Sequence, residues 1–133
     1  MCLGTLTMGP LQAGLSADEG AKLIVRAHSM GVNFFDTAEL YRTYDHLALA
    51  LRTIPRSEVV IASRCYEYTY DGMKASIERA LNAIGTDYID IFGLHEQESA
   101  LTLTGHAEAL RCAADAKSAG TIRAVSVSTH TIA

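Results

Sequence analysis

Short apolar segments alternate with longer segments of helical periodicity along this chain of 133 residues, and one such unit recurs about every thirty residues. We expect strands at 3–8, 32–35, 58–63, 87–94 and 121–127. We expect helices at 16–30, 44–52, 70–84 and 105–119. Strands that are separated by helices pair in parallel through right-handed crossover connections. The alternation therefore predicts an α/β fold with a parallel sheet.

Capping residues mark several of the helix boundaries. Ser16 and Glu19 have the spacing of a capping box, in which each side chain bonds the backbone N–H of the other residue. Gly31, Gly85 and Gly120 follow three of the helical segments, where glycine readily adopts the left-handed conformation that ends a helix. These signals predict where the helices begin and end.

We expect one domain over residues 1–133, because the apolar content of 49% is that of a globular protein and no linker interrupts the chain. Two architectures fit four strand–helix units followed by a fifth strand. An open doubly wound sheet of the flavodoxin type suits the length better, since a closed (β/α)8 TIM barrel typically takes about 250 residues. A partial barrel of four to five units is the other possibility.

Composition argues against several classes of partner. A net charge of −4 and the lack of a long basic run disfavour nucleic acid and anionic membranes. No apolar run approaches the roughly 18 residues of a membrane span, and the Met1 end shows no secretory signal pattern. An odd number of cysteines without CxxC spacing indicates reduced thiols and a cytoplasmic protein. Three histidines within helical segments are expected on the surface: His28, His46 and His106.

Polar side chains follow four consecutive predicted strands at their carboxyl ends: Asp36, Arg64, His95 and Ser128. Tyr41 lies five residues beyond Asp36, in the same loop. In a barrel these strand ends meet at one mouth, where a carboxylate, a cation, an imidazole and a phenol could transfer protons. A tyrosine with a pKa near ~10 needs a neighbouring cation to act at neutral pH. The plainer alternatives are solvated loop residues, a structural ion pair of Arg64 with Asp36, and a hydrogen-bonded histidine.

A metal site is a further alternative for the same strand ends. Asp36, Glu39, His95 and His130 are chemically suitable ligands for a divalent ion in a hydrolase or isomerase. No HxH or HExxH spacing supports that alternative.

Four segments of the chain resemble consecutive signatures of the aldo-keto reductase family. They are Gly-Val-Asn-Phe-Phe-Asp-Thr-Ala-Glu-Leu-Tyr at 31–41, Val-Val-Ile-Ala-Ser-Arg at 59–64, Asp-Tyr-Ile-Asp-Ile…Leu-His at 87–95, and Lys-Ser-Ala-Gly-Thr-Ile-Arg-Ala-Val-Ser-Val-Ser-Thr-His at 117–130. The resemblance covers essentially the whole chain. The Gly-Leu-His-Glu loop and the Ser-Thr-His sequence look most like the subgroup whose longer members add a C-terminal iron–sulfur domain.

The resemblance implies the N-terminal half of a (β/α)8 barrel and NAD(P)H-dependent reduction of a small aldehyde or ketone. Tyr41 would then be the general acid that protonates the carbonyl oxygen as NADPH delivers hydride. Asp36 and Arg64 would tune the pKa of Tyr41, and His95 would orient the carbonyl. Ser128, followed by Thr129, would hold the nicotinamide carboxamide.

Departures from the family pattern limit what the resemblance implies. Arg64 stands where the family has lysine; it keeps a positive charge that could still favour tyrosinate, but its larger planar fork would tend to bind Asp36 bidentately. Arg42 replaces a family glycine, and Thr129 replaces an asparagine. The sixth to eighth strands, which carry most cofactor contacts in the family, lie beyond Ala133.

A half barrel has open sheet edges and an uncovered interior, both of which promote association. We therefore expect either a missing C-terminal half or self-association as a dimer. A non-catalytic or self-assembling half barrel is the alternative to an active reductase.

Overall fold

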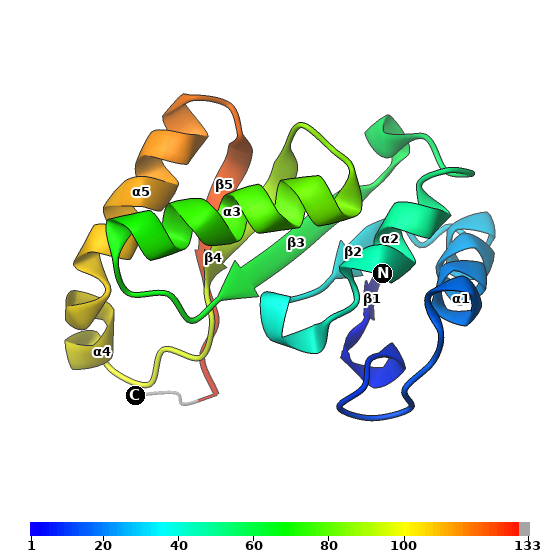
Figure 1. Cartoon of the computed structure of the whole chain (residues 1–133), viewed down its shortest axis with the longest axis horizontal. Coiled ribbons are helices and arrows are strands. Elements are labelled where there is room, and N and C mark those ends of the chain that lie inside the picture. The colour runs from blue at the N-terminus through cyan, green and yellow to red at the C-terminus, as the bar shows by residue number, and fades with distance from the viewer. Residues whose placement is uncertain (131–133) are drawn as a thin grey trace.

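Five strands form one parallel sheet in the computed structural model, which describes residues 1–130. The sheet order follows the chain order, β1-β2-β3-β4-β5 (Figure 1). The strands are β1 (Cys2–Gly4), β2 (Phe34–Asp36), β3 (Val60–Cys65), β4 (Ile89–Leu94) and β5 (Ile122–Val127).

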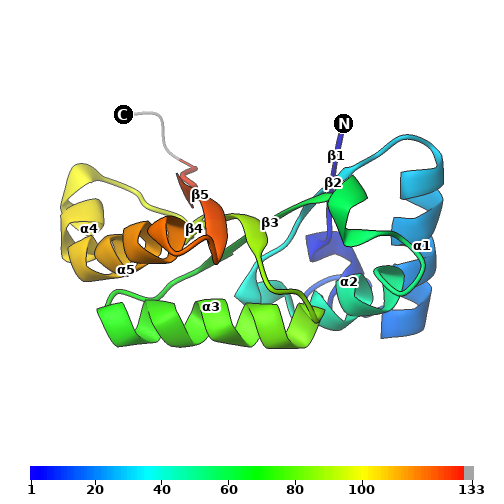
Figure 2. The same cartoon turned by 90° about the horizontal axis from the view of Figure 1, so that it is seen from above.

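Helices connect successive strands: α1 (Ala17–Ser29), α2 (Tyr44–Ala50), α3 (Tyr70–Ile84), α4 (Ala100–Gly105) and α5 (Ala107–Ser118). Three short 3-10 turns lie between them, η1 (Leu6–Met8), η2 (Glu39–Tyr41) and η3 (Arg56–Glu58). The long helices lie along one side of the sheet, and the opposite side is uncovered (Figure 2). Within the described part of the chain, no helix has the length and apolar character needed to cross a membrane.

The strand order decides between the two architectures. A doubly wound sheet reverses direction after its first strands and places helices on both faces. Here each new strand is added on the same side of its predecessor, and the helices share one face. The expectation of a flavodoxin-like sheet is therefore wrong, and the partial (β/α)8 barrel is confirmed.

The predicted caps of the helices are confirmed. Ser16 and Glu19 form the reciprocal capping box of α1. Helix α3 has the same bounds as the predicted segment, and Gly85 follows it at φ 76°, in the left-handed region that glycine tolerates.

The core fills the space between the sheet and the helices. Buried strand residues pack against buried helical ones, and the largest are Phe35, Ile61, Phe92 and Leu94 from the sheet and Ile24, Leu47, Met73 and Ile84 from the helices. Each such side chain that leaves water contributes roughly 1.5–3 kcal/mol to folding.

Alternation along β3 assigns side chains to the two faces of the sheet. Ser63 hydrogen-bonds Tyr44 of α2 at 2.8 Å, and the Cys65 sulfur lies 3.7 Å from the Met73 sulfur of α3, so both point toward the helices. Arg64, between them, points to the open face.

The expected strand at 3–8 is wrong beyond Gly4. Thr5 donates both its backbone N–H, at 2.8 Å, and its hydroxyl, at 3.1 Å, to the Asp36 carbonyl. Its hydroxyl also lies 2.7 Å from the Thr43 hydroxyl. The Thr5 N–H thus extends the β1–β2 ladder by one bond, and the chain then turns into η1 at Leu6.

Two further expectations are corrected. His46 is 4% exposed, not a surface residue, and it fills the space left by Gly20, where a Cβ atom would collide with the imidazole. Residues 100–105 form a separate helix, α4, which begins at a capping box of Ser99 with Thr102. That box has Thr102 in place of the usual Glu or Gln at its third helical position, so the sequence indicates only weakly that a helix begins there.

Candidate active site

Asp36 and Arg64 form an ion pair on the open face of the sheet. Asp36 ends β2 and aligns with Ala62 of β3, so its side chain shares a face with that of Arg64 two residues later. Their side chains are 24% and 19% exposed. The predicted alternative of an ion pair at the barrel rim therefore describes how these two residues interact.

Tyr41 and His95 face each other at the same end of the sheet. The Tyr41 hydroxyl lies 3.4 Å from His95 Nε2, and the two rings meet edge to face with centroids 5.6 Å apart and planes at 74°. Tyr41 comes from η2 and His95 from the residue after β4, so two units that are 54 residues apart meet at one point.

Gly9 and a cluster of threonine hydroxyls hold the loop that carries Tyr41 in place. The Gly9 backbone lies so close to the Tyr41 carbonyl that a Cβ atom at position 9 would collide with it. The Thr43 hydroxyl lies 2.7 Å from that of Thr5 and 2.9 Å from that of Thr37, and all three threonines are fully buried. This hydroxyl cluster fixes the chain on both sides of η2.

Arg42, immediately after Tyr41, has φ 54°. This left-handed conformation costs a residue with a Cβ atom roughly 1–2 kcal/mol. Glycine, the residue that the resemblance implies at this position, would have no such cost, so Arg42 places local strain beside Tyr41.

His95 is 4% exposed and held by its backbone. Its N–H donates to the Cys65 carbonyl at 2.8 Å, and its carbonyl accepts from Gln97 Nε2 at 3.1 Å. Nδ1 is buried and has no hydrogen-bond partner among the described residues. A buried nitrogen acceptor without a partner costs less free energy than a buried N–H donor without one. Nδ1 is therefore the unprotonated nitrogen, and the hydrogen is on Nε2, which faces Tyr41.

Burial dominates the acid–base properties of this pair. Burial first, and then the positive charge of Arg64, lower the pKa of His95 below 6.5, so the imidazole is neutral at pH 7. Burial, followed by the Glu96 carboxylate, raises the pKa of Tyr41 above 10. Tyr41 is therefore a protonated phenol at neutral pH, and the cation expected to lower its pKa is paired with Asp36 instead.

Ser128 follows β5 at the same end of the sheet. Its hydroxyl accepts the Glu96 N–H at 2.9 Å, its N–H donates to the Leu94 carbonyl at 3.0 Å, and its carbonyl accepts the Gln97 N–H at 2.7 Å. Thr129 is the next residue. The cofactor roles of both residues remain predictions.

Tyr66 and Glu96 belong to the same cluster. The alternation of Tyr66, Tyr68 and Tyr70 in the sequence suggests a substrate mouth or an aromatic loop surface for Tyr66, but it does not predict the contact with His95 or Glu96. The Tyr66 ring stacks on that of His95 with centroids 4.7 Å apart, and its hydroxyl donates to the Glu96 carboxylate. One signal was present: Tyr66 lies two residues beyond Arg64, so strand alternation puts it on the same face.

The residues proposed for a metal site do not converge. Glu39 accepts from the Ser76 hydroxyl and from Arg79 Nε, at 2.6 Å for the latter, and so faces α3. Among residues 1–130, no three His, Cys, Asp or Glu side chains are grouped as a metal site would require. The metal alternative therefore lacks a ligand set in the described structure.

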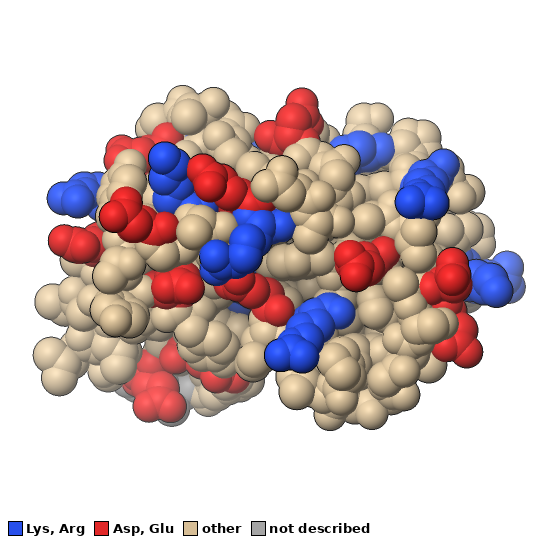
Figure 3. All heavy atoms as spheres, in the orientation of Figure 1, with Lys and Arg blue, Asp and Glu red and all other residues tan. Residues whose placement is uncertain are grey.

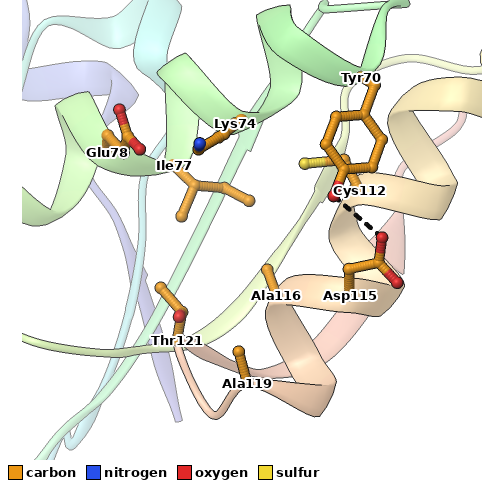
Figure 4. A pocket seen from close by; sticks show the side chains of 9 residues that line it. All are labelled: Tyr70, Lys74, Ile77, Glu78, Cys112, Asp115, Ala116, Ala119 and Thr121. Atoms are coloured by element: carbon orange, nitrogen blue, oxygen red, sulfur yellow. Dashed lines mark hydrogen bonds between the residues drawn. The ribbon is translucent and has the colours of Figure 1, made fainter.

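A groove of about 240 Å³ lies elsewhere, between α3 and α5 (Figure 4). Tyr70 donates to Asp115 across it at 2.9 Å, and Ile77 and Ala116 contribute apolar walls. It belongs to the helix layer, not to the strand ends.

On the helix-covered side of the molecule, acidic and basic side chains are interspersed (Figure 3).

Comparison with known proteins gives a consistent result. The family model described as "Aldo/keto reductase family" matches residues 1–133. Aldo-keto reductase family 1 member C21 of Mus musculus is 32% identical over 102 residues, which cover 70% of this chain and 31% of the mouse protein.

Solved structures show the same fold. A protein of Pseudomonas aeruginosa assigned to the aldo-keto reductases superposes with a TM-score of 0.83 at 27% identity, over 96% of this chain and 54% of the other. The Bombyx mori aldo-keto reductase in complex with NADP superposes with a TM-score of 0.77 at 20% identity, over 96% and 45%. This chain thus spans between 31% and 54% of the length of these relatives.

Proposed function

Because the chain belongs to the aldo/keto reductase family, we propose that it carries the acid–base half of an NAD(P)H-dependent site that reduces an aldehyde or ketone. The observation that supports this most strongly is the approach of the Tyr41 hydroxyl to His95 Nε2, at 3.4 Å. A hydrogen-bonding group from η2 and one from the end of β4 thus meet at one position, where a carbonyl oxygen can bind.

Tyr41 acts as the acid in this proposal. The oxygen of the substrate accepts hydrogen bonds from the Tyr41 hydroxyl and from His95 Nε2–H. A nicotinamide cofactor, when bound, supplies the hydride that adds to the carbonyl carbon. The C=O π electrons move to oxygen, and the phenolic proton of Tyr41 neutralises it, so that the product is an alcohol and Tyr41 is left as tyrosinate. Arg64, which pairs with Asp36, acts electrostatically on the neighbouring His95.

Ser128 and Thr129 are the residues that we propose for the nicotinamide end. A carboxamide offers one acceptor and two donors, and a serine hydroxyl that already accepts the Glu96 N–H still has its proton to donate. The chemistry of this hydroxyl therefore fits the carboxamide oxygen. NADPH is the cofactor that the resemblance to the family implies, and membership of the aldo/keto reductase family supports a nicotinamide cofactor in general.

A complete barrel has eight strands, and the described half barrel supplies five of them, so further strands are needed to complete the site. We propose that residues 1–133 are one barrel domain whose open face is covered by further barrel strands or by a second copy. The three cysteines are free thiols, which suits a cytoplasmic protein.

A non-catalytic half barrel is the second candidate, and one observation favours it. Arg64 pairs with Asp36, and the pKa of Tyr41 is raised, not lowered. A site without a free cation near the acid stabilises tyrosinate poorly, which would slow turnover or abolish it.

The test follows NADPH consumption with a panel of aldehydes and ketones, for the protein in its native assembly. Tyr41→Phe keeps the ring and removes the acid, so we expect turnover to fall by about 100-fold or more. Tyr68→Phe removes a hydroxyl from a residue that is 64% exposed and should leave the rate unchanged. Equal rates for Tyr41→Phe and the unmodified protein would contradict the proposal.

A further inference from the structure

The imidazole of His95 is held between two phenol rings. Tyr66, one residue beyond β3, stacks on its face, with centroids 4.7 Å apart and planes at 24°. Tyr41 meets its edge, with centroids 5.6 Å apart and planes at 74°. The face contact excludes water from one side of the ring and restricts rotation about the Cβ–Cγ bond.

Tyr66 is itself anchored at its far end. Its hydroxyl donates to the Glu96 carboxylate, and Glu96 Oε1 also lies 3.1 Å from His130 Nε2. Glu96 has φ 51°, which a residue with a Cβ atom keeps only where its surroundings hold it. The Glu96 N–H donates to the Ser128 hydroxyl at 2.9 Å, which supplies part of that support.

We propose that Tyr66 is a positioning residue that sets the ring plane and protonation of His95, with Glu96 as its anchor. It acts through His95 and not on the substrate, and its relevance to catalysis rests on the proposed function. The arrangement joins three strand ends, because β3 leads into Tyr66, β4 leads into His95 and Glu96, and β5 leads into Ser128.

Removal of Tyr66 should change the charge state of His95 in a defined direction. The titratable groups that face His95 are Tyr41 from η2, Arg64 from β3, Glu96 beside it and His130 beyond β5. Without the Tyr66 ring, water reaches the imidazole, and the Glu96 carboxylate is released to interact with it. Both changes favour imidazolium, so the pKa of His95 rises toward 6.5.

The experiment is an NMR pH titration of the five histidine rings in the 133-residue chain, with His95 assigned from a His95→Asn variant. We expect Tyr66→Ala to raise the pKa of His95 toward 6.5, and Tyr66→Phe, which keeps the stacked ring, to raise it less. The matched control is Tyr68→Ala, because Tyr68 contacts His106 and not His95, at a centroid distance of 6.5 Å. It should leave His95 unchanged.

Two results would overturn the proposal. One is a His95 titration that is the same in Tyr66→Ala as in the unmodified chain, while the signals of the other four rings show a folded protein. The other is the absence of nuclear Overhauser contacts between the Tyr66 and His95 rings in the unmodified chain, which decides the matter even if Tyr66→Ala fails to fold. Neither measurement needs turnover, so an inactive protein would count against the proposed function and not against this role of Tyr66.

Discussion

Arg64 is the residue at which this chain departs from the acid–base arrangement that the resemblance to the family implies. Its guanidinium pairs with Asp36. The pKa of Tyr41 is instead raised by burial and by the Glu96 carboxylate. The cation is present at the strand end, but its partner is the carboxylate and not the phenol. The chemistry that the site can perform therefore depends on whether this cation can turn toward Tyr41.

Arg64→Lys tests that dependence. A lysine ammonium is a compact charge without a fork, so it can remain near Asp36 and approach Tyr41 as well. We expect the pKa of Tyr41 to fall, as measured by NMR of 13C-labelled tyrosine rings, and carbonyl reduction to increase by roughly tenfold or more. Arg64→Gln, which removes the charge, should not increase the rate. A rise in the rate with both variants would mean that the charge at position 64 is not the limiting factor.

His95 gives a pH dependence of stability with a definite sign. Its pKa is lowered in the folded state, so between 6.5 and that lower value the unfolded chain binds a proton that the folded chain does not. The free energy of unfolding should therefore be highest above pH 6.5 and fall as the pH decreases through this window. Urea titrations at a series of pH values give the free energy of unfolding of the unmodified chain and of His95→Asn. The difference between the two proteins in how this free energy changes with pH isolates the contribution of His95. An equal slope for both proteins would show that burial of His95 does not resist protonation.

At the scale of elements, the sequence predicted the helices better than the turns that carry the site. Helix α3 has the predicted bounds because its apolar spacing, its Thr69 cap and Gly85 agree. β1 was overextended because apolar residues continue to Met8, whereas the chain turns into η1 at Leu6; the Thr5 hydroxyl just before that turn bonds Asp36 and Thr43, which lie more than thirty positions away. Local propensity contains no information about such partners.

The candidate site also contains residues that the sequence predicted and a contact that it did not. Asp36, Arg64, His95 and Ser128 were predictable, because a parallel strand delivers the residue at its carboxyl end to a known edge. The contact of Tyr66 with Glu96 was not, because it depends on the left-handed backbone at Glu96. A glutamate gives no sequence signal for that conformation.

Gly9→Ala tests how η2 is positioned. Its backbone, at φ −74° and ψ 174°, suits any residue, but the new methyl group would collide with the Tyr41 carbonyl. We expect the variant to lower the free energy of unfolding by about 1–3 kcal/mol and to shift the NMR signals of Tyr41. Gly105→Ala is the matched control, because a Cβ atom at that helical position meets nothing within 4 Å, and it should be neutral or stabilising by up to about 1 kcal/mol. Equal losses in both variants would indicate that Gly9 does not support the loop.

At the scale of the whole molecule, the described half barrel leaves β1 and β5 as edges and one face of the sheet uncovered. Val125 and Val127 of β5 are 37% and 46% exposed. Exposed apolar side chains on an unpaired edge favour pairing with another strand. The 133-residue chain in isolation should therefore associate with itself, and as a monomer it should reduce no aldehyde above background.

Val127→Lys tests this expectation at one edge. A charge on an edge strand opposes strand pairing, so native mass spectrometry should show a shift from assemblies toward the 14.3 kDa monomer. Leu101→Lys is the control, because Leu101 is 81% exposed but lies on α4, away from the sheet edges. An unmodified chain that is monomeric at every concentration tested would show that these edges do not drive association.

Transfer of deuterium from NADPH labelled at the nicotinamide C4 position tests the central claim most directly. The measurement uses the protein in its native assembly and analyses the alcohol product by mass spectrometry. The proposed site predicts one deuterium on the former carbonyl carbon, formed by the unmodified protein and largely lost with Tyr41→Phe. A product without deuterium, or no product from a folded and fully assembled protein, would contradict the assignment of a carbonyl-reducing site to these strand ends.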